Sequence, residues 1–172
     1  MPSLRAAFSL VPEYLRTLDR EQPVHDFNEY QPQLGRRMRA LKLWFLVRYF
    51  GVDGLRRRID RHCRLAEQLA VDVDAHPDFE RLAPVPFSTV CLRWRPAALA
   101  GHEDEPEVRA RLDAANERLM AAVNATGEIF LSHTRLHGRF AIRVAIGNLR
   151  TEERHVARAW ALLQAEAVRL AA

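Results

Sequence analysis

The stretch from Leu34 to Ala70 constrains the fold more than any other, because its apolar residues recur at every third or fourth position. That spacing places them along one side of a helix. Two such series follow each other: Leu34, Met38, Leu41 and Phe45, and then Leu55, Ile59, Cys63, Ala66 and Ala70. Between the two series, Gly51 can end a helix in a left-handed conformation and Asp53 can cap the next one. The sequence therefore predicts two consecutive amphipathic helices rather than one long rod.

Downstream of these helices the pattern changes to short strands and two further helices. Residues 88–95 alternate, with Val90, Leu92 and Trp94 on one face, which is typical of a half-buried strand. We expect strands at residues 79–83, 88–95, 129–136 and 139–146, a hairpin turn at His137-Gly138, and helices that begin at Pro106 and after the cap residue Thr151. The helix stripes are Val108, Leu112, Ala115, Leu119 and Val123, and then Val156, Trp160, Leu163, Ala167 and Leu170. The order β, β, α, β, β, α predicts an α+β fold, in which a mostly antiparallel sheet has helices on one side.

Arg143 is the candidate binding residue that the strand pattern itself provides. It shares a strand face with Ala141 and Ala145, whose small side chains leave room above the guanidinium. A guanidinium presents a planar fork that suits a carboxylate. The pattern is equally compatible with a structural ion pair or with an arginine that caps a sheet edge.

The charge distribution and the two cysteines bear on the class of protein. Of the 26 cationic residues only Lys42 is a lysine, and a pI of about 9.7 is compatible with a nucleic-acid surface. The arginines are interleaved with carboxylates, however, which favours an ordinary solvated surface.

Cys63 and Cys91 lie on a helix stripe and in a strand, as reduced thiols of a cytoplasmic protein would. No apolar run approaches the length that crosses a membrane, and no histidine spacing is typical of a metal site.

Two adjoining segments, HDFNEYQPQ at residues 25–33 and LGRRMRALKLWF at residues 34–45, carry a family resemblance. The sequences of these two segments resemble those of the group II pyridoxal-phosphate-dependent decarboxylases, in particular the aromatic-L-amino-acid decarboxylases. The resemblance runs from about Leu4 to the last helix and corresponds to the C-terminal third of such an enzyme. It implies the small C-terminal domain of a fold-type I PLP enzyme, preceded by a loop and long linker helices. Residues 1–41 would be a remnant of the large PLP-binding domain with its mobile catalytic loop, and residues 42–172 the linker helices and the small domain.

The resemblance also implies roles for three residues. Tyr14, in VPEYLR, matches a loop tyrosine that protonates the substrate Cα after CO₂ leaves, where relatives with Phe are similar to aldehyde synthases. Gly35 matches a position at which glycine accompanies a roomy aromatic pocket. Arg143 matches an arginine that lies near the active site in the resembled family and that meets a substrate carboxylate in the related glutamate decarboxylases. Without the resemblance, Tyr14 is a surface aromatic, and Gly35 is as well explained as a helix-entry glycine.

The Schiff-base lysine of the resembled family lies in a His-Lys motif upstream of the mobile loop. Lys42, in RALKLWF, matches a non-catalytic position instead. We therefore expect the chain to be part of a homodimeric decarboxylase that uses pyridoxal 5'-phosphate on aromatic amino acids, inactive by itself. The alternative is a noncatalytic module for oligomerisation or for arginine-rich nucleic-acid binding.

Overall fold

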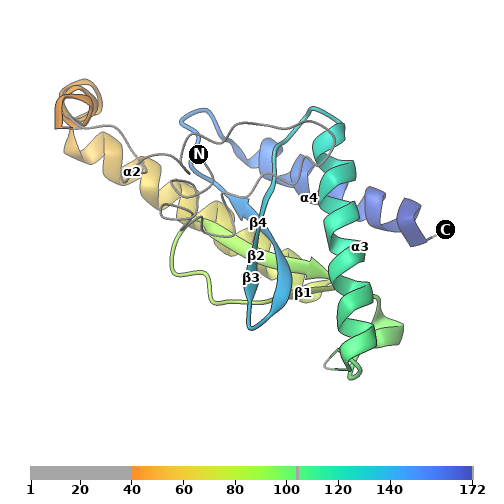
Figure 1. The fold of residues 1–172 in the computed structure, drawn as a ribbon. Coiled ribbons are helices and arrows are strands. Elements are labelled where there is room, and N and C mark those ends of the chain that lie inside the picture. The colour runs from red at the N-terminus through yellow and green to blue at the C-terminus, as the bar shows by residue number, and fades with distance from the viewer. Residues whose placement is uncertain (1–39, 104, 172) are drawn as a thin grey trace, which may run out of the picture. The chain divides into compact units, whose positions relative to one another are not determined.

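A computed structural model of the chain describes residues 40–103 and 105–171 (Figure 1). The chain divides into two units, one ending at Leu55 and the other comprising Arg56–Ala172, and each is described by itself. Seven main elements follow the sequence in the predicted order: α2 (Ala40–Ala75), β1 (Phe79–Arg81), β2 (Thr89–Trp94), α3 (Pro106–Ala125), β3 (Ser132–Leu136), β4 (Arg139–Ala145) and α4 (Glu153–Ala171). A short 3-10 helix, η3 (Ala97–Leu99), precedes α3.

The predicted break in the first helix is confirmed at Gly51. Helical dihedral angles are interrupted there, with φ at 67° and ψ at 167°. The positive φ agrees with the prediction, but this ψ lies far from the left-handed helical value. It belongs to an extended region that essentially only glycine occupies. A side chain at residue 51 would therefore strain the backbone at the interruption.

The buried stripe of the second half of α2 is rotated from the predicted one. Ala66 and Ala70 are buried as expected, but Ile59 is 52% exposed and Cys63 is only half-buried. The stripe consists instead of His62, Leu65, Ala66, Leu69, Ala70 and Val73. Its spacing is still three or four residues, so the periodicity identified the helix but not the angle of its buried side.

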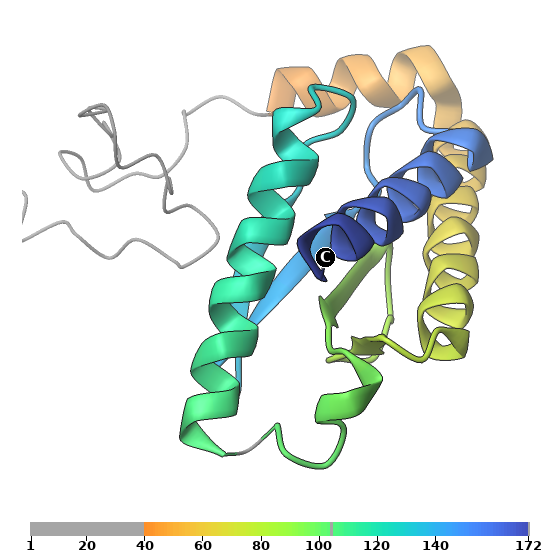
Figure 2. The ribbon, with the colours of Figure 1, turned by 90° about the vertical axis from the view of Figure 1, so that its right-hand side faces the viewer.

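The four strands form one antiparallel sheet in the order β1-β2-β4-β3. Their bulky residues meet in register on one face, where Leu92 of β2 pairs with Ile142 of β4, which pairs with His133 of β3. Helix α3 packs against β2 and β4 and also against α4 (Figure 2). The ring of Trp160 in α4 contacts that of Phe79 in β1. The predicted α+β fold, with helices on one side of an antiparallel sheet, is therefore confirmed.

The predicted hairpin turn is also confirmed. His137 and Gly138 both have positive φ, at 50° and 75°, as a two-residue type I′ turn requires. The strand before the turn begins at Ser132, however, and not at Ile129. The reason is Asn124 of α3, whose side-chain amide accepts a hydrogen bond from Leu131 N–H at 2.7 Å and donates one to Leu131 C=O at 3.0 Å. Leu131 bonds the helix and not the neighbouring strand.

Polar side chains of α3 complete the sheet where β2 and β4 separate. Asn116, fully buried, accepts a hydrogen bond from Trp94 N–H at 2.7 Å and donates one to Trp94 C=O at 2.8 Å. Asp113 accepts a hydrogen bond from Phe140 N–H at 2.9 Å. The expected stripe is confirmed at Leu112, Leu119 and Val123, whereas Val108 and Ala115 are half-buried and Asn116 and Met120 are buried. The helix thus satisfies backbone groups that no strand reaches.

The start of α4 differs from the prediction by two residues. The helix begins at Glu153, so the residue before it is Glu152 and not Thr151. His155 Nδ1 accepts a hydrogen bond from Glu152 N–H at 2.9 Å, the reciprocal half of a capping box in which histidine replaces the usual Glu or Gln. Val156, Leu163 and Ala167 are buried as predicted. In the described part of the chain, no helix has both the length and the apolar character needed to cross a membrane.

Candidate functional site

Of the three predicted site residues, the structure places only Arg143. Tyr14 and Gly35 lie outside the described residues, so their predicted roles stay predictions. Arg143 lies in the last part of β4 and is half-buried. Its strand neighbours on the same face are Ala141, which is buried, and Ala145, which is exposed.

Two polar residues flank Arg143 across the sheet. Cys91 of β2 and Ser132 of β3 are its register partners, so their side chains lie on the same face as the guanidinium. Burial raises the pKa of the Cys91 thiol, and the nearby charge of Arg143 opposes that rise only in part. The thiol is therefore held in its neutral form beside a cation. On this face of the sheet the Ser132 hydroxyl and the neutral Cys91 thiol therefore lie on either side of the Arg143 guanidinium.

Sequence reasoning missed the buried arginine on the same face. Strand alternation placed Arg93 on the exposed side of β2, but its side chain is completely buried. Its Nε donates to the carboxylate of Glu80, its register partner in β1, while neither Nη1 nor Nη2 has a hydrogen-bond partner among the described residues. A buried guanidinium is tolerated when a carboxylate compensates its charge. The signal available in the sequence was a glutamate in the preceding short strand.

Several other arginines in the described part of the chain also form ion pairs with carboxylates. Arg95 donates to Glu103 at 2.6 Å, and this bond lowers the pKa of the Glu103 carboxyl below its ordinary value. Further pairs are Arg81–Asp74, Arg135–Asp113, Arg154–Glu152, Arg158–Glu128 and Arg169–Glu166. Carboxylates are therefore paired with several of the arginines in the described part of the chain.

The described residues do not fit a covalent anchor for pyridoxal phosphate. Lys42, the only lysine, is exposed on α2 and borders a shallow apolar hollow with Phe45, Leu46, Tyr49 and Phe50. No group suited to a phosphate accompanies it in that hollow. Among the described residues, no cluster of three or more His, Cys, Asp or Glu side chains is arranged to hold a metal ion.

Comparison with protein families gives a direct match. The model described as "Pyridoxal-dependent decarboxylase conserved domain" matches residues 2–95, which is more than half of the 172 residues. The matched region begins near the N-terminus and ends just after β2. It therefore includes Tyr14 and Gly35 but not Arg143.

Individual relatives match nearly the whole chain. Tyrosine decarboxylase 2 of Arabidopsis thaliana is 40% identical over 166 residues, covering 96% of this chain and 29% of that protein. Phenylacetaldehyde synthase of Arabidopsis thaliana is 39% identical over 166 residues, covering 96% of this chain and 32% of that protein. The chain thus spans about a third of the length of the curated relatives that it matches.

A solved structure agrees with these sequence matches. The crystal structure of Oryza sativa TDC with PLP and tryptamine superposes with a TM-score of 0.67 at 35% sequence identity. The superposition covers 83% of this chain and 29% of that chain. The fold, the family model and the relatives agree, and the chain belongs to the pyridoxal-dependent decarboxylase family.

Proposed function

We propose that the chain is the C-terminal portion of a PLP-dependent carboxy-lyase that acts on aromatic L-amino acids. The observation that carries the proposal is the position of Arg143 in a chain of this family. It is half-buried and lies between Cys91 and Ser132 on a face where the adjacent Ala141 and Ala145 leave space. A partly desolvated guanidinium with small neighbours is suited to bind a carboxylate in two-point geometry.

The aromatic substrate class is supported by the relatives. One of them is named as a tyrosine decarboxylase, and the Oryza sativa structure contains tryptamine. Phenylacetaldehyde synthase is nearly as similar, so overall identity does not separate amine formation from aldehyde formation. Tyr14 favours amine formation, because its hydroxyl is protonated at neutral pH and would donate a proton to the substrate Cα once CO₂ has left.

The remaining parts of the proposal concern the complete enzyme. It would be a cytoplasmic homodimer, and its upstream region would hold pyridoxal phosphate. Gly35 would leave room for an aromatic ring, because it has no side chain. The 172-residue chain by itself would release no CO₂ from aromatic amino acids, since Lys42 is its only lysine and lies in an exposed apolar setting.

The test uses a restored enzyme, in which the upstream part of the Arabidopsis tyrosine decarboxylase is joined to this chain. We expect CO₂ release from L-tyrosine or L-tryptophan by the restored enzyme and none by the chain alone. A folded restored enzyme that binds pyridoxal phosphate but releases no CO₂ from aromatic amino acids would contradict the proposal. So would turnover by the chain alone.

The role of Arg143 is tested in the same protein. Arg143→Lys keeps the charge but removes the planar fork, so KM should rise by about tenfold or more. Arg139→Lys is the matched control, since it lies on the same strand and the same face at the hairpin end. Equal effects of the two substitutions on KM would show that Arg143 is only one of the surface arginines.

A further inference from the structure

A pocket with a volume of about 530 Å³ lies on the helix side of the sheet, where α4 begins. We call it the α4 pocket and define it by its lining: residues 128–131, residues 144–146, Asn148, Arg150, Thr151, and four residues of α4, namely His155, Val156, Arg158 and Ala159. Of the β4 residues that line it, Val144 lies on the sheet face opposite to Arg143, whereas Ala145 shares the face of Arg143. Its size is that of a site for a small organic molecule.

The α4 pocket exists because two segments diverge. The side chain of Asn124 holds Leu131 through two hydrogen bonds, so residues 129–131 leave the sheet instead of pairing with β4. The last residues of β4 therefore have no strand beside them on the β3 side. Residues of α4 line the gap that this leaves. The floor is apolar and consists of side chains that are largely buried: Leu131, Val144, Ile146, Val156 and Ala159.

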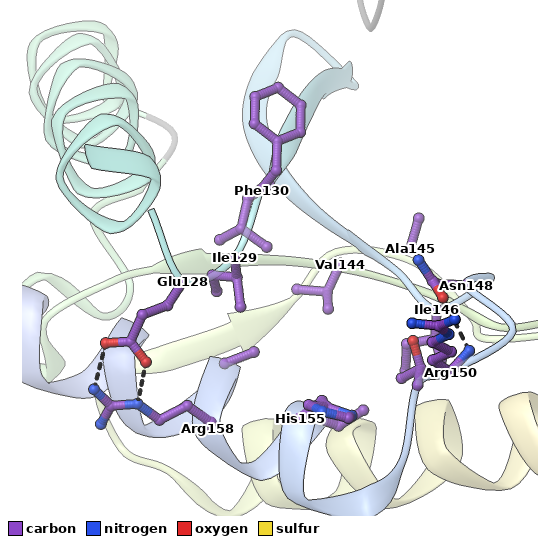
Figure 3. Close-up of a pocket in the computed structure, with 14 residues that line it drawn as sticks. Glu128, Ile129, Phe130, Val144, Ala145, Ile146, Asn148, Arg150, His155 and Arg158 are labelled. Carbon is purple, nitrogen blue, oxygen red and sulfur yellow. Dashed lines mark hydrogen bonds and ion pairs between the residues drawn. The ribbon is translucent and has the colours of Figure 1, made fainter. Parts of the chain in front are cut away.

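The two ends of the α4 pocket differ in charge (Figure 3). At one end Arg158 makes a two-point ion pair with Glu128, with distances of 2.7 and 2.6 Å. This ion pair holds the pKa of the Glu128 carboxyl below its ordinary value, so the glutamate stays ionised. Because the charge of Arg158 is already neutralised by the Glu128 carboxylate, this end of the pocket does not attract an incoming anion.

The other end offers hydrogen-bond donors. Arg150 lies there beside Asn148, whose side chain accepts a hydrogen bond from Arg150 N–H at 2.9 Å and so fixes the loop (Figure 3). In the described part of the chain the Arg150 guanidinium has no ion-pair partner. His155 lines the pocket as well, and its Nδ1 already accepts the hydrogen bond from Glu152 N–H. The neutral ring therefore carries its proton on Nε2, which is a second donor.

We propose that the α4 pocket binds a small carboxylate with an aryl-sized apolar body. The body lies on the floor formed by Val144, Ile146 and Val156, and the carboxylate meets Arg150 and His155. The floor provides apolar surface, and the donors at one end fix the orientation, as in most small-molecule sites. This proposal does not rest on decarboxylation, because it concerns binding to residues of α4 and β4 alone.

The experiment titrates the full chain with phenylacetate and follows the methyl resonances of Val144, Ile146 and Val156 by NMR. Phenylacetamide has the same ring and no charge, so it should bind about tenfold or more weakly, as expected for the loss of a charge-assisted bond. Arg150→Gln should weaken phenylacetate binding by a similar factor and leave phenylacetamide binding unchanged.

Arg154→Gln is the matched control. Arg154 is the second residue of α4. It is exposed, pairs with Glu152 at 3.0 Å and does not line the pocket. Its substitution should leave both ligands unaffected. Three outcomes would overturn the proposal: no shift of the three methyl resonances, equal affinity for the acid and the amide, or equal losses in the two variants. Equal affinity would assign the pocket to an apolar side chain of another polypeptide instead.

Discussion

The two halves of helix α2 differ in the exposure of their apolar side chains, although they follow each other directly in the sequence. Between residues 41 and 52 most large apolar side chains are exposed on all sides of the helix: Leu41, Leu43, Trp44, Phe45, Leu46, Val47, Tyr49 and Val52. Between residues 62 and 73 the apolar side chains form one stripe, and that stripe is buried. Helix periodicity is present in both halves, and the second half finds its contacts within the unit comprising residues 56–172.

The difference shows that the number of packing partners a helix needs depends on how much of its circumference is apolar. A narrow stripe needs one packing partner, whereas a helix that is apolar all round is normally enclosed in the interior of a larger protein. The unit of residues 56–172 has an apolar core of its own, drawn from three helices and from β1, β2 and β4, while His133 of β3 is a buried polar residue. The described residues up to Leu55 have surface that residues from outside this range must cover. Stability and association should therefore respond to substitutions in different halves of α2.

The largest effect on stability is expected for Leu69→Ala, in the buried stripe. Leu69 is 1% exposed, so its truncation should lower the free energy of unfolding by about 2–5 kcal/mol. Leu43→Ala makes the same chemical change in the first half, where the side chain is 61% exposed, and should alter stability by less than about 0.5 kcal/mol. Urea unfolding of both variants gives the measurement. Comparable losses would show that residues 41–52 are already packed in this chain.

The next effect concerns catalysis and should leave stability unchanged. In the restored enzyme, Tyr14→Phe removes the proton donor and keeps the ring, so the rate of amine formation should fall by about 10²-fold or more. Product should shift from amine towards aldehyde and ammonia, with dioxygen as the oxidant. Amine and aldehyde are measured in parallel under air. Amine formation at the unaltered rate, without aldehyde, would make Tyr14 an ordinary loop residue.

A third, smaller effect should appear in self-association. Trp44→Gln removes apolar surface from the exposed first half, and the loss of one large side chain from a contact should weaken association by about tenfold. Val71→Gln is the control, because Val71 is also exposed, at 61%, but lies in the second half of α2, outside the run of exposed apolar residues 41–52. Sedimentation velocity over a range of concentrations measures both. A chain that is monomeric throughout, with Trp44 intact, would contradict the expectation.

The comparison also explains which features of the fold the sequence predicted. Element order and the turn at His137-Gly138 depend on local patterns, namely strand alternation, helix spacing and the need for positive φ, and all were predicted correctly. Gly51 was recognised because a glycine at the end of one periodic series is a local signal too.

Two of the errors occurred where a side chain hydrogen-bonds to a backbone group far from it in the sequence. Asn124 ends the predicted strand early by bonding Leu131, and Asn116 is buried because Trp94 needs partners beside β2. Such contacts join residues that are 7 and 22 positions apart, and no periodicity reports them. Arg93 was placed on an exposed face for a different reason, because only its ion pair with the side chain of Glu80, 13 positions away, shows how its charge is compensated. The candidate site was predicted as three separate residues, and only Arg143 can be placed among its neighbours.

The smallest expected effect is pH-dependent and tests whether ion pairs add to the core of residues 56–172. Glu103 pairs with Arg95, and both side chains are largely buried, with 15% and 21% of their surface exposed. The hydrogen bond from Arg95 lowers the pKa of the Glu103 carboxyl below its ordinary value near 4.5. The carboxylate is therefore favoured by folding, and its contribution is present above pH 4.5 and is lost as the pH falls through the lowered pKa.

Glu103→Gln should accordingly reduce stability at neutral pH by about 1 kcal/mol or less, and the difference from the unaltered chain should shrink below pH 4.5. Urea midpoints measured across this range give the curve. The control repeats the substitution in an Arg95→Gln background, where the pH-dependent difference should become smaller, because the Arg95 donor is gone and only backbone hydrogen bonds still lower the pKa of the Glu103 carboxyl. A difference that stays undiminished there, or that grows as the pH falls, would assign the effect of Glu103 to contacts other than Arg95. The packing of the stripe around Leu69 would then account for the stability of this unit without its ion pairs.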